Sequence, residues 1–157
     1  MVSASCASVR HVRIVLHAMK RKRVLFLCTH NSARSQMAEG LLRSYGCDSY
    51  EPFSAGTEAT AVRPEAIKVM AEVGIDIGKQ ESKCLDRYLG DAFDLVVTVC
   101  DRARESCPVF PGAAENRHWD FDDPAAAKGS ESERLAVFRR VRDEIAGRIR
   151  ELVEAPI

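Results

Sequence analysis

The chain has 157 residues, 46% of them hydrophobic, and its 23 basic residues balance its 23 acidic ones. This is enough apolar material for one core and too little for two, and no apolar run is long enough to span a bilayer, so we expect one soluble domain without a membrane partner. All 23 acids and only 17 basic residues lie after residue 23, a negative balance that disfavours nucleic acid as a partner.

Residues 1–22 are expected to form an extension outside a folded domain that comprises residues 23–157. The extension is rich in Arg and Ser and has no acid, which is the composition of an organelle transit peptide. Met19 stands directly before a basic tetrapeptide and the first apolar run, so a natural start at Met19 with an upstream extension is the simpler interpretation. We expect this segment to be flexible or weakly packed.

The apolar pattern predicts strands that alternate with helices. We expect strands at residues 24–27, 50–55, 95–99 and 117–121, and helices at residues 35–45 and 64–73. A last helix is marked by apolar residues at three- and four-residue steps from Leu135 to Leu152, behind a capping box of Ser130 and Glu133. Such alternation predicts an α/β fold with a parallel sheet, which binds ligands at the carboxyl ends of its strands.

The six cysteines do not indicate a disulfide framework. The chain is long enough to build its own core and lacks the apolar stretch of a secretory signal, so reduced thiols in a cytoplasmic protein fit better. Three cysteines have no context that suggests chemistry, namely Cys6, Cys47 and Cys84. The other three stand at the ends of predicted elements.

Cys28 directly follows the first predicted strand, and Arg34 and Ser35 lie at the start of the next helix. A loop that opens a helix turns several backbone N–H groups toward one spot, and the helix dipole adds positive charge there, so a tetrahedral dianion fits it. Arg34 can bind two oxygens of such an anion. Its charge and the helix terminus are expected to lower the pKa of the Cys28 thiol, and Ser35 to donate a hydrogen bond to the sulfur.

Two other interpretations of this segment are less favoured. A buried cysteine followed by an unrelated arginine would not explain the strand, the Cys-x5-Arg-Ser spacing and the helix together. A metal site would require further ligands near Cys28 and His30 at metal-binding spacing, and the sequence has none there. We therefore predict no metal.

Residues 28–40 read Cys-Thr-His-Asn-Ser-Ala-Arg-Ser-Gln-Met-Ala-Glu-Gly, which resembles the phosphate loop of the low-molecular-weight protein tyrosine phosphatase superfamily, above all its thioredoxin-coupled arsenate reductases. The resemblance extends from about residue 23 to the last helix. It implies a doubly wound four-stranded parallel sheet flanked by helices, with Cys28 as the nucleophile. It also implies a substrate-binding loop made of Thr29, His30, Asn31, Ser32, Ala33, Arg34 and Ser35.

A second pair of cysteines, Cys100 and Cys107, frames the polar segment 101–106. If this segment is helical, a rise of 1.5 Å per residue puts the pair about 10 Å apart, beyond the roughly 7 Å limit for a disulfide. The segment would have to unwind before the two thiols could join. The residues alone leave open two unrelated cysteines or zinc ligands. The resemblance implies two resolving cysteines, which the phosphatases lack.

Asp123 precedes Pro124 in the loop after the last predicted strand. A carboxyl group near a bound anion has a raised pKa and can protonate a leaving oxygen, although an Asp-Pro turn is an equally ordinary interpretation. The match of Trp-x-Phe-Asp-Asp-Pro to the family implies that Asp123 is the general acid, with Asp122 as the second choice. Trp119 is expected in the core.

The chain also departs from the phosphatases. They usually have a second cysteine where this chain has Ala33, and tyrosines where it has Ala125 and Ala126. Both differences point away from phosphotyrosine as the substrate.

Another departure concerns a cation site behind the loop. In some reductases an acidic residue holds a potassium ion there, together with the counterparts of Asn31, Glu39 and Ser54. Here Lys83 aligns with that acid, so its ammonium could occupy the place of the cation. We predict no potassium requirement.

The resemblance therefore implies the reduction of arsenate to arsenite by a relay of Cys28, Cys100 and Cys107. The electrons would come from thioredoxin or a similar reductant, such as mycoredoxin or glutaredoxin, without an organic cofactor. The first alternative is a low-molecular-weight phosphatase that hydrolyses an ester with Cys28, Arg34 and Asp123. The second is a redox-sensing or anion-binding module without catalytic turnover.

Overall fold

The structure is a computed structural model, which describes residues 20–106 and 109–157. Its strands form a single parallel sheet in the order β2-β1-β3-β4. Their bounds are β1 (Lys22–Cys28), β2 (Tyr50–Gly56), β3 (Phe93–Thr98) and β4 (Ala113–His118). The predicted four-stranded parallel sheet is confirmed.

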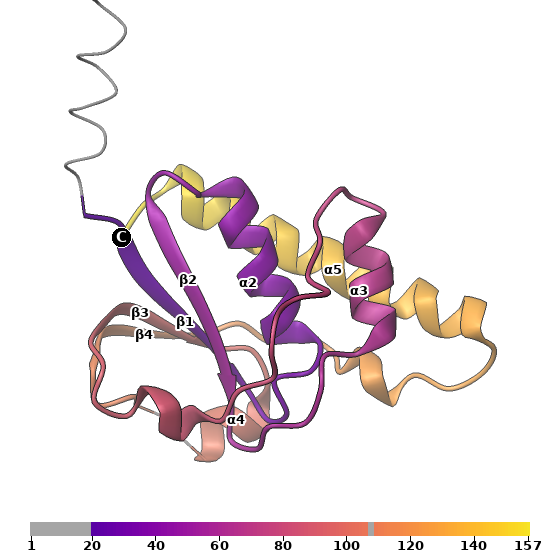
Figure 1. Cartoon of the computed structure of the whole chain (residues 1–157), viewed down its shortest axis with the longest axis horizontal. Helices are drawn as coiled ribbons and strands as arrows, with labels where there is room; N and C mark the ends of the chain where they lie inside the picture. The colour runs from indigo at the N-terminus through magenta and orange to yellow at the C-terminus, as the bar shows by residue number, and fades with distance from the viewer. Residues whose placement is uncertain (1–19, 107–108) are drawn as a thin grey trace, which may run out of the picture.

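Helices cover the sheet mainly on one side. They are α2 (Arg34–Tyr45), α3 (Pro64–Ala71), α4 (Asp101–Ser106) and α5 (Glu131–Glu154), with two short 3₁₀ turns, η1 (Leu85–Tyr88) and η2 (Pro124–Ala126). Figure 1 shows α2, α3 and α5 together on one side of the sheet, and α4 at the end where the strands finish. Within the described part of the chain, no helix is long and apolar enough to cross a membrane.

β1 is buried on both faces, because its side chains alternate between two cores. Val24 and Phe26 face the larger core, which β1 shares with α2, α3 and α5. Leu25 and Leu27 face the smaller core, to which η1 and Phe110 contribute. This double burial explains the continuous apolar run, and it brings Cys28 to the carboxyl edge of the sheet.

The last strand lies earlier in the chain than predicted. β4 spans Ala113–His118 instead of residues 117–121, and it pairs only with β3 at the edge of the sheet. An edge strand with exposed polar side chains gives a weak apolar pattern, whereas the buried Trp119 and Phe121 imitate one. Helix α3 also ends two residues before its predicted end, ahead of a turn in which Gly74 has φ +78°.

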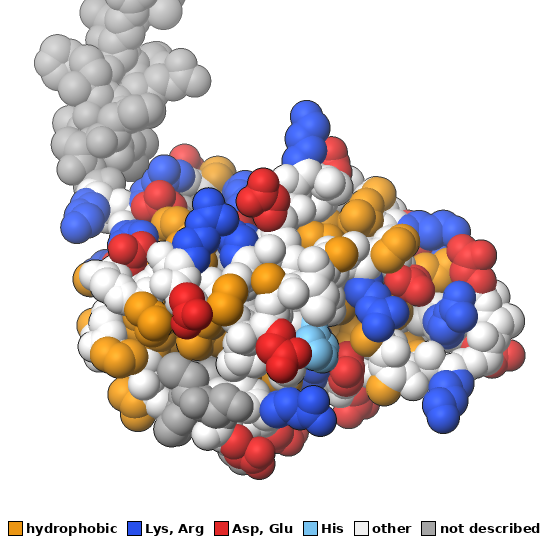
Figure 2. All heavy atoms as spheres, turned by 60° about the horizontal axis from the view of Figure 1, so that its bottom comes forward, with side chains coloured by type: hydrophobic (Ala, Val, Ile, Leu, Met, Phe, Trp, Pro, Cys, Tyr) orange, Lys and Arg blue, Asp and Glu red, His pale blue; other side chains and the backbone are white. Residues whose placement is uncertain are grey.

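The capping prediction for the last helix is confirmed. The Ser130 side chain accepts a hydrogen bond from the Glu133 N–H at 3.2 Å, at the start of α5. On the surface, Figure 2 shows basic and acidic side chains interspersed among the described residues of the face in view.

Candidate active site

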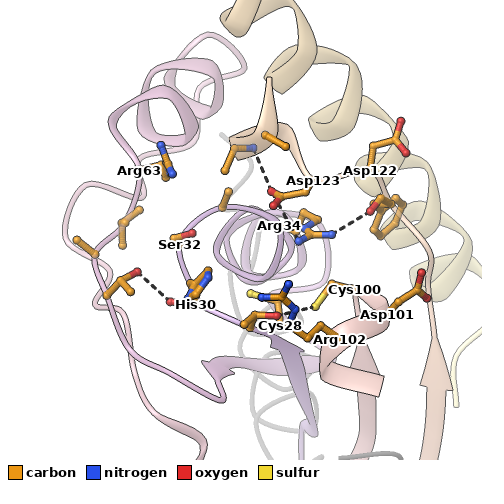
Figure 3. A pocket seen from close by; sticks show the side chains of 18 of the residues that line it. Cys28, His30, Ser32, Arg34, Arg63, Cys100, Asp101, Arg102, Asp122 and Asp123 are labelled. Atoms are coloured by element: carbon orange, nitrogen blue, oxygen red, sulfur yellow. Dashed lines mark hydrogen bonds and ion pairs between the residues drawn. The ribbon is translucent and has the colours of Figure 1, made fainter. Parts of the chain in front are cut away.

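An open cavity of about 960 Å³ lies at the carboxyl ends of β1 and β3. Its lining brings together residues from four parts of the chain: the loop after β1, the start of α3, the start of α4 and the loop around η2. Figure 3 shows Cys28, Arg34, Cys100 and Asp123 around this cavity. The sequence predicted these residues from separate motifs, and the fold gathers them in one place.

The Cys28 sulfur sits in a nest of hydrogen-bond donors, and only 4% of the residue is exposed. Its Sγ lies 2.9 Å from Ser35 Oγ and accepts a hydrogen bond from the Asn31 backbone N–H at 3.1 Å. Asn31 Nδ2 in turn donates to Ser35 Oγ at 2.8 Å, which leaves the Ser35 hydroxyl proton available for the sulfur. These two hydrogen bonds favour the thiolate form of Cys28, whereas burial of the sulfur opposes it.

The loop owes its shape to Asn31, which is fully buried and has the left-handed φ of 49°. Its Oδ1 accepts hydrogen bonds from Gln36 Nε2 and from the Lys83 backbone N–H, both at 2.8 Å. Gly56 at the end of β2 allows the loop to approach. A Cβ there would lie 2.6 Å from Thr29 O and 2.8 Å from Asn31 N, so only glycine fits.

Arg34 connects the loop to the segment that carries the predicted acid. Its side chain is 13% exposed, and its Nη1 donates to Phe121 O at 3.0 Å. Its Nη2 lies 3.6 Å from Asp123 Oδ1, an oxygen that also accepts from the Ala125 N–H at 3.0 Å. Asp123 thus caps a turn and faces the cavity at the same time, which reconciles the two interpretations of the Asp-Pro pair.

Cys100 reaches the cavity from the junction of β3 and α4. It is buried, its Sγ lies 3.4 Å from Thr29 Oγ1, and the Ala103 N–H donates to the same sulfur at 3.4 Å. Residues 101–106, considered above as a possible short helix, are helical and form α4. Cys107 lies outside the described residues, so its distance from Cys100 stays a prediction.

Residues 23–155 match the family described as low molecular weight phosphotyrosine protein phosphatase. The chain belongs to this family. An arsenate reductase from Halalkalibacterium halodurans is 52% identical over 136 residues, which are 87% of this chain and 98% of that protein. The resemblance of residues 28–40 to this superfamily is therefore confirmed.

Solved structures of arsenate reductases share the fold of this phosphatase-family chain. One, described as an arsenate reductase in the phosphate binding state, is 34% identical, with a TM-score of 0.74, and covers 85% of this chain and 97% of its own. A thioredoxin-dependent arsenate reductase from Corynebacterium glutamicum is 30% identical, with a TM-score of 0.68, and covers 94% of this chain and 69% of its own.

The predicted lowering of the Cys28 pKa is wrong for this member of the phosphatase family. Burial raises the pKa of the thiol, the hydrogen bond from Ser35 opposes this rise, and the nearby Cys100 adds to it. The Asn31 N–H and the Arg34 charge lower the pKa by smaller amounts. The sequence indicates the positive charges near Cys28, but it does not show that the fold buries the sulfur almost completely.

Behind the phosphatase-family loop, the structure brings Lys83 to Glu39, as the alignment of Lys83 with the cation site led us to expect. Lys83 Nζ lies 3.7 Å from Glu39 Oε2 and donates to Glu81 O at 2.9 Å, and the side chain is 11% exposed. Ser54 Oγ donates to the same Glu39 oxygen. Burial lowers the pKa of Lys83, and the Glu39 charge opposes this effect. The lack of a potassium requirement stays a prediction.

Two further arginines line the cavity, Arg63 and Arg102, and neither was predicted from the sequence. Arg63 precedes α3, and its backbone N–H donates to Ser32 O at 2.8 Å. Arg102 belongs to the first turn of α4. The only signal for either was a basic side chain next to Pro64 or close to Cys100, which is too common to be informative.

His118 was missed as well, although it anchors α4. Its Nδ1 lies 2.8 Å from Thr98 Oγ1, and its Nε2 lies 3.2 Å from Asp101 Oδ1, so it connects the ends of β3 and β4 to the first residue of α4. Asp120 offers a third ligand atom, and the three atoms lie within 4.8 Å of one another. The prediction of no metal rested on the surroundings of Cys28 and did not consider this group.

Proposed function

We propose that this protein reduces arsenate to arsenite by passing electrons through Cys28, Cys100 and Cys107 in turn. One observation carries the proposal: a single cavity is lined by a buried thiol, an arginine, a carboxyl group and a second thiol. A phosphatase requires the first three, whereas the second thiol has a purpose only in redox chemistry. The arsenate reductases among the relatives support the same conclusion.

The substrate anion binds in the loop that opens α2. A tetrahedral oxyanion accepts hydrogen bonds from the loop N–H groups of residues 29–35, and Arg34 holds two of its oxygens. Arg34 then exchanges part of its interaction with Asp123 for the anion, since the two side chains are only 3.6 Å apart. The bound anion then lies beside Asp123, which lines the same cavity.

In the first step the Cys28 thiolate attacks arsenic. A sulfur–arsenic bond forms and an arsenic–oxygen bond breaks, while Asp123 donates a proton so that the oxygen leaves as water. Arsenic remains pentavalent. Ser35 and the Asn31 N–H stabilise the thiolate before the attack, because both donate to its sulfur.

In the second step the Cys100 thiolate attacks Cys28 Sγ. A disulfide forms, the sulfur–arsenic bond breaks, and its electron pair stays on arsenic, which leaves as trivalent arsenite. Thr29 Oγ1 and the Ala103 N–H lie 3.4 Å from Cys100 Sγ and can stabilise its thiolate. Cys107 then attacks Cys100, which releases Cys28 and leaves a disulfide between Cys100 and Cys107.

An external dithiol supplies the two electrons that reduce this disulfide, and thioredoxin is the expected donor. The proposal is tested by following arsenate-dependent NADPH oxidation with thioredoxin and thioredoxin reductase, and in parallel with mycoredoxin or glutaredoxin systems. We expect turnover with thioredoxin. The proposal is wrong if none of the three systems supports turnover of added arsenate.

Hydrolysis of a phosphate ester is the second candidate, favoured by the family match of residues 23–155. It would use Cys28, Arg34 and Asp123 without either later cysteine. An aryl phosphate assay measures it directly. Ester hydrolysis without any arsenate-dependent NADPH oxidation would make the phosphatase the main activity.

A further inference from the structure

Arg102 occupies an unusual position, because it belongs to the redox segment and also lines the anion cavity. It lies in the first turn of α4, two residues after Cys100. Figure 3 shows its side chain pointing from α4 into the cavity, toward Cys28. A side chain in this location can couple the anion bound in the cavity to the position of α4.

The charges around Arg102 leave it available for an anion. Four of the described residues that line the cavity are acids, and three of them pair with a basic side chain, the exception being Asp120. Asp123 pairs with Arg34, Asp122 with Arg140 at 3.0 Å and Asp101 with His118 at 3.2 Å. Arg102 itself makes no ion pair within the described residues. A dianion in the cavity would be its first strong electrostatic partner.

The proposed reaction changes the charge in the cavity at one particular step. Arsenate and its adduct with Cys28 are anions, whereas arsenite is released as the neutral trihydroxide at neutral pH. Arg102 is therefore attracted into the cavity before the sulfur–arsenic bond breaks, and loses this attraction afterwards. The same step is the one after which Cys107 must approach Cys100.

We infer that Arg102 senses the charge of the bound species and holds α4 folded over the cavity while an anion is present. This inference rests on the proposed function and deepens it. In the anionic states Arg102 keeps Cys100 beside Thr29, in position to attack Cys28. Once neutral arsenite has left, Arg102 no longer holds α4, whose anchors among the described residues include the pair of Asp101 and His118 and the buried Ala103. This six-residue helix can then unwind for the last thiol exchange.

The experiment measures amide hydrogen exchange of residues 100–107 in the reduced protein, with and without inorganic phosphate. Potassium chloride at matched ionic strength controls for salt. In the unmodified chain, phosphate should slow exchange in α4 several-fold. In Arg102→Ala we expect phosphate to bind about three- to fivefold more weakly, as for the loss of an exposed ion pair. The slowing in α4 should then be lost even when the phosphate concentration is raised to equal occupancy.

Arg63→Ala is the matched control, since it removes another guanidinium of the cavity, from a segment that carries no relay cysteine. It should weaken phosphate binding and still show the slowing in α4 at equal occupancy. Arg102→Lys should restore part of the slowing. In turnover assays, Arg102→Ala should raise the KM for arsenate about three- to fivefold and should also lower kcat, because Cys100 is less well positioned.

Two results would overturn the inference: equal slowing in Arg102→Ala and the unmodified chain at matched occupancy, or no slowing in either. Both results come from hydrogen exchange with phosphate, which involves no turnover. They therefore do not depend on whether the protein reduces arsenate. If phosphate slows exchange in α4 and arsenate is not reduced, Arg102 remains a charge sensor and only the proposed reaction is wrong.

Discussion

The phosphate loop and α4 meet in the same cavity but are held in different ways. In the loop, the buried Asn31 uses its side chain and its backbone N–H to connect the Cys28 sulfur, Ser35, Gln36 and the backbone of residue 83. In α4, the described side chains of residues 101, 102 and 105 are exposed, and Ala103 is buried.

The difference matches the chemistry that each part has to perform. The loop must present N–H groups and a thiolate in one fixed geometry, because a displaced donor stabilises an oxyanion poorly. The α4 segment must first hold Cys100 near Cys28 and then bring Cys107 to it. A six-residue helix with little buried surface can open at a small cost in free energy. Opening the loop would cost more, because it would break the buried hydrogen bonds of Asn31.

Removal of the loop nucleophile should have the largest effect. Cys28→Ser is expected to reduce both arsenate reduction and aryl phosphate hydrolysis by more than about a thousandfold, because both reactions start from the same thiolate. Coupled NADPH oxidation and release of the aryl alcohol measure the two. Cys47→Ser, which changes an exposed cysteine, is the control and should keep both activities. If Cys28→Ser retains either activity, the nucleophile has been wrongly assigned.

Loss of the last relay thiol should separate the two parts of the site. Cys107→Ser is expected to complete about one turnover of arsenate and then stop, while aryl phosphate hydrolysis continues, because Cys107 does not contact the oxyanion. Mass spectrometry of the stalled protein should find Cys100 in a disulfide with Cys28 or with an added thiol. Continued cycling at the unmodified rate with thioredoxin would contradict the relay.

The raised pKa of Cys28 gives a third test, which concerns the loop alone. Ser35→Ala removes a hydrogen bond that lowers this pKa, so the pKa should rise further and less thiolate should be present at neutral pH. A hydrogen bond to a charged group contributes about 1.5–3 kcal/mol, so the first step should slow about ten- to a hundredfold at neutral pH. The loss should shrink as the pH rises, because alkaline pH restores the thiolate.

The pH profile of single-turnover arsenate reduction measures this effect. Ser44→Ala on the exposed face of the same helix is the control, and it should keep the profile of the unmodified chain. An equal loss at every pH in Ser35→Ala would mean that Ser35 acts on geometry and not on the ionisation of Cys28.

Local patterns were sufficient to predict the parts of the site that are close in sequence. Cys28, Arg34 and Ser35 lie between the end of one strand and the start of one helix, so their spacing alone predicts that they surround the same anion-binding loop. The predicted contacts of Lys83 required the resemblance, because a lysine far along the chain carries no local signal for Glu39. The pKa of Cys28 was predicted in the wrong direction because its burial depends on how β1, α2 and α4 pack together.

The position of β4 and the role of Arg102 were both missed from the sequence. The last strand was predicted too late in the chain, because the exposed edge strand β4 lacks the apolar run of β1. Arg102 was missed because only the fold shows that its side chain lines the cavity. Sequence patterns report burial and local geometry. They do not report which side chains from distant segments meet.

The smallest expected effect concerns the cation behind the loop. Lys83 Nζ lies 3.7 Å from Glu39 Oε2, the oxygen that also accepts a hydrogen bond from Ser54 Oγ. Because the ammonium already supplies a positive charge there, thermal unfolding and activity should be equal in sodium and potassium chloride at matched ionic strength. In Lys83→Asp the ammonium is replaced by a further carboxylate oxygen, and oxygen ligands are the ones that hard cations prefer. This variant should therefore unfold at a higher temperature in potassium than in sodium. A potassium-specific stabilisation of the unmodified chain would show that Lys83 does not replace the cation. The loop would then depend on a bound ion as well as on its own hydrogen bonds.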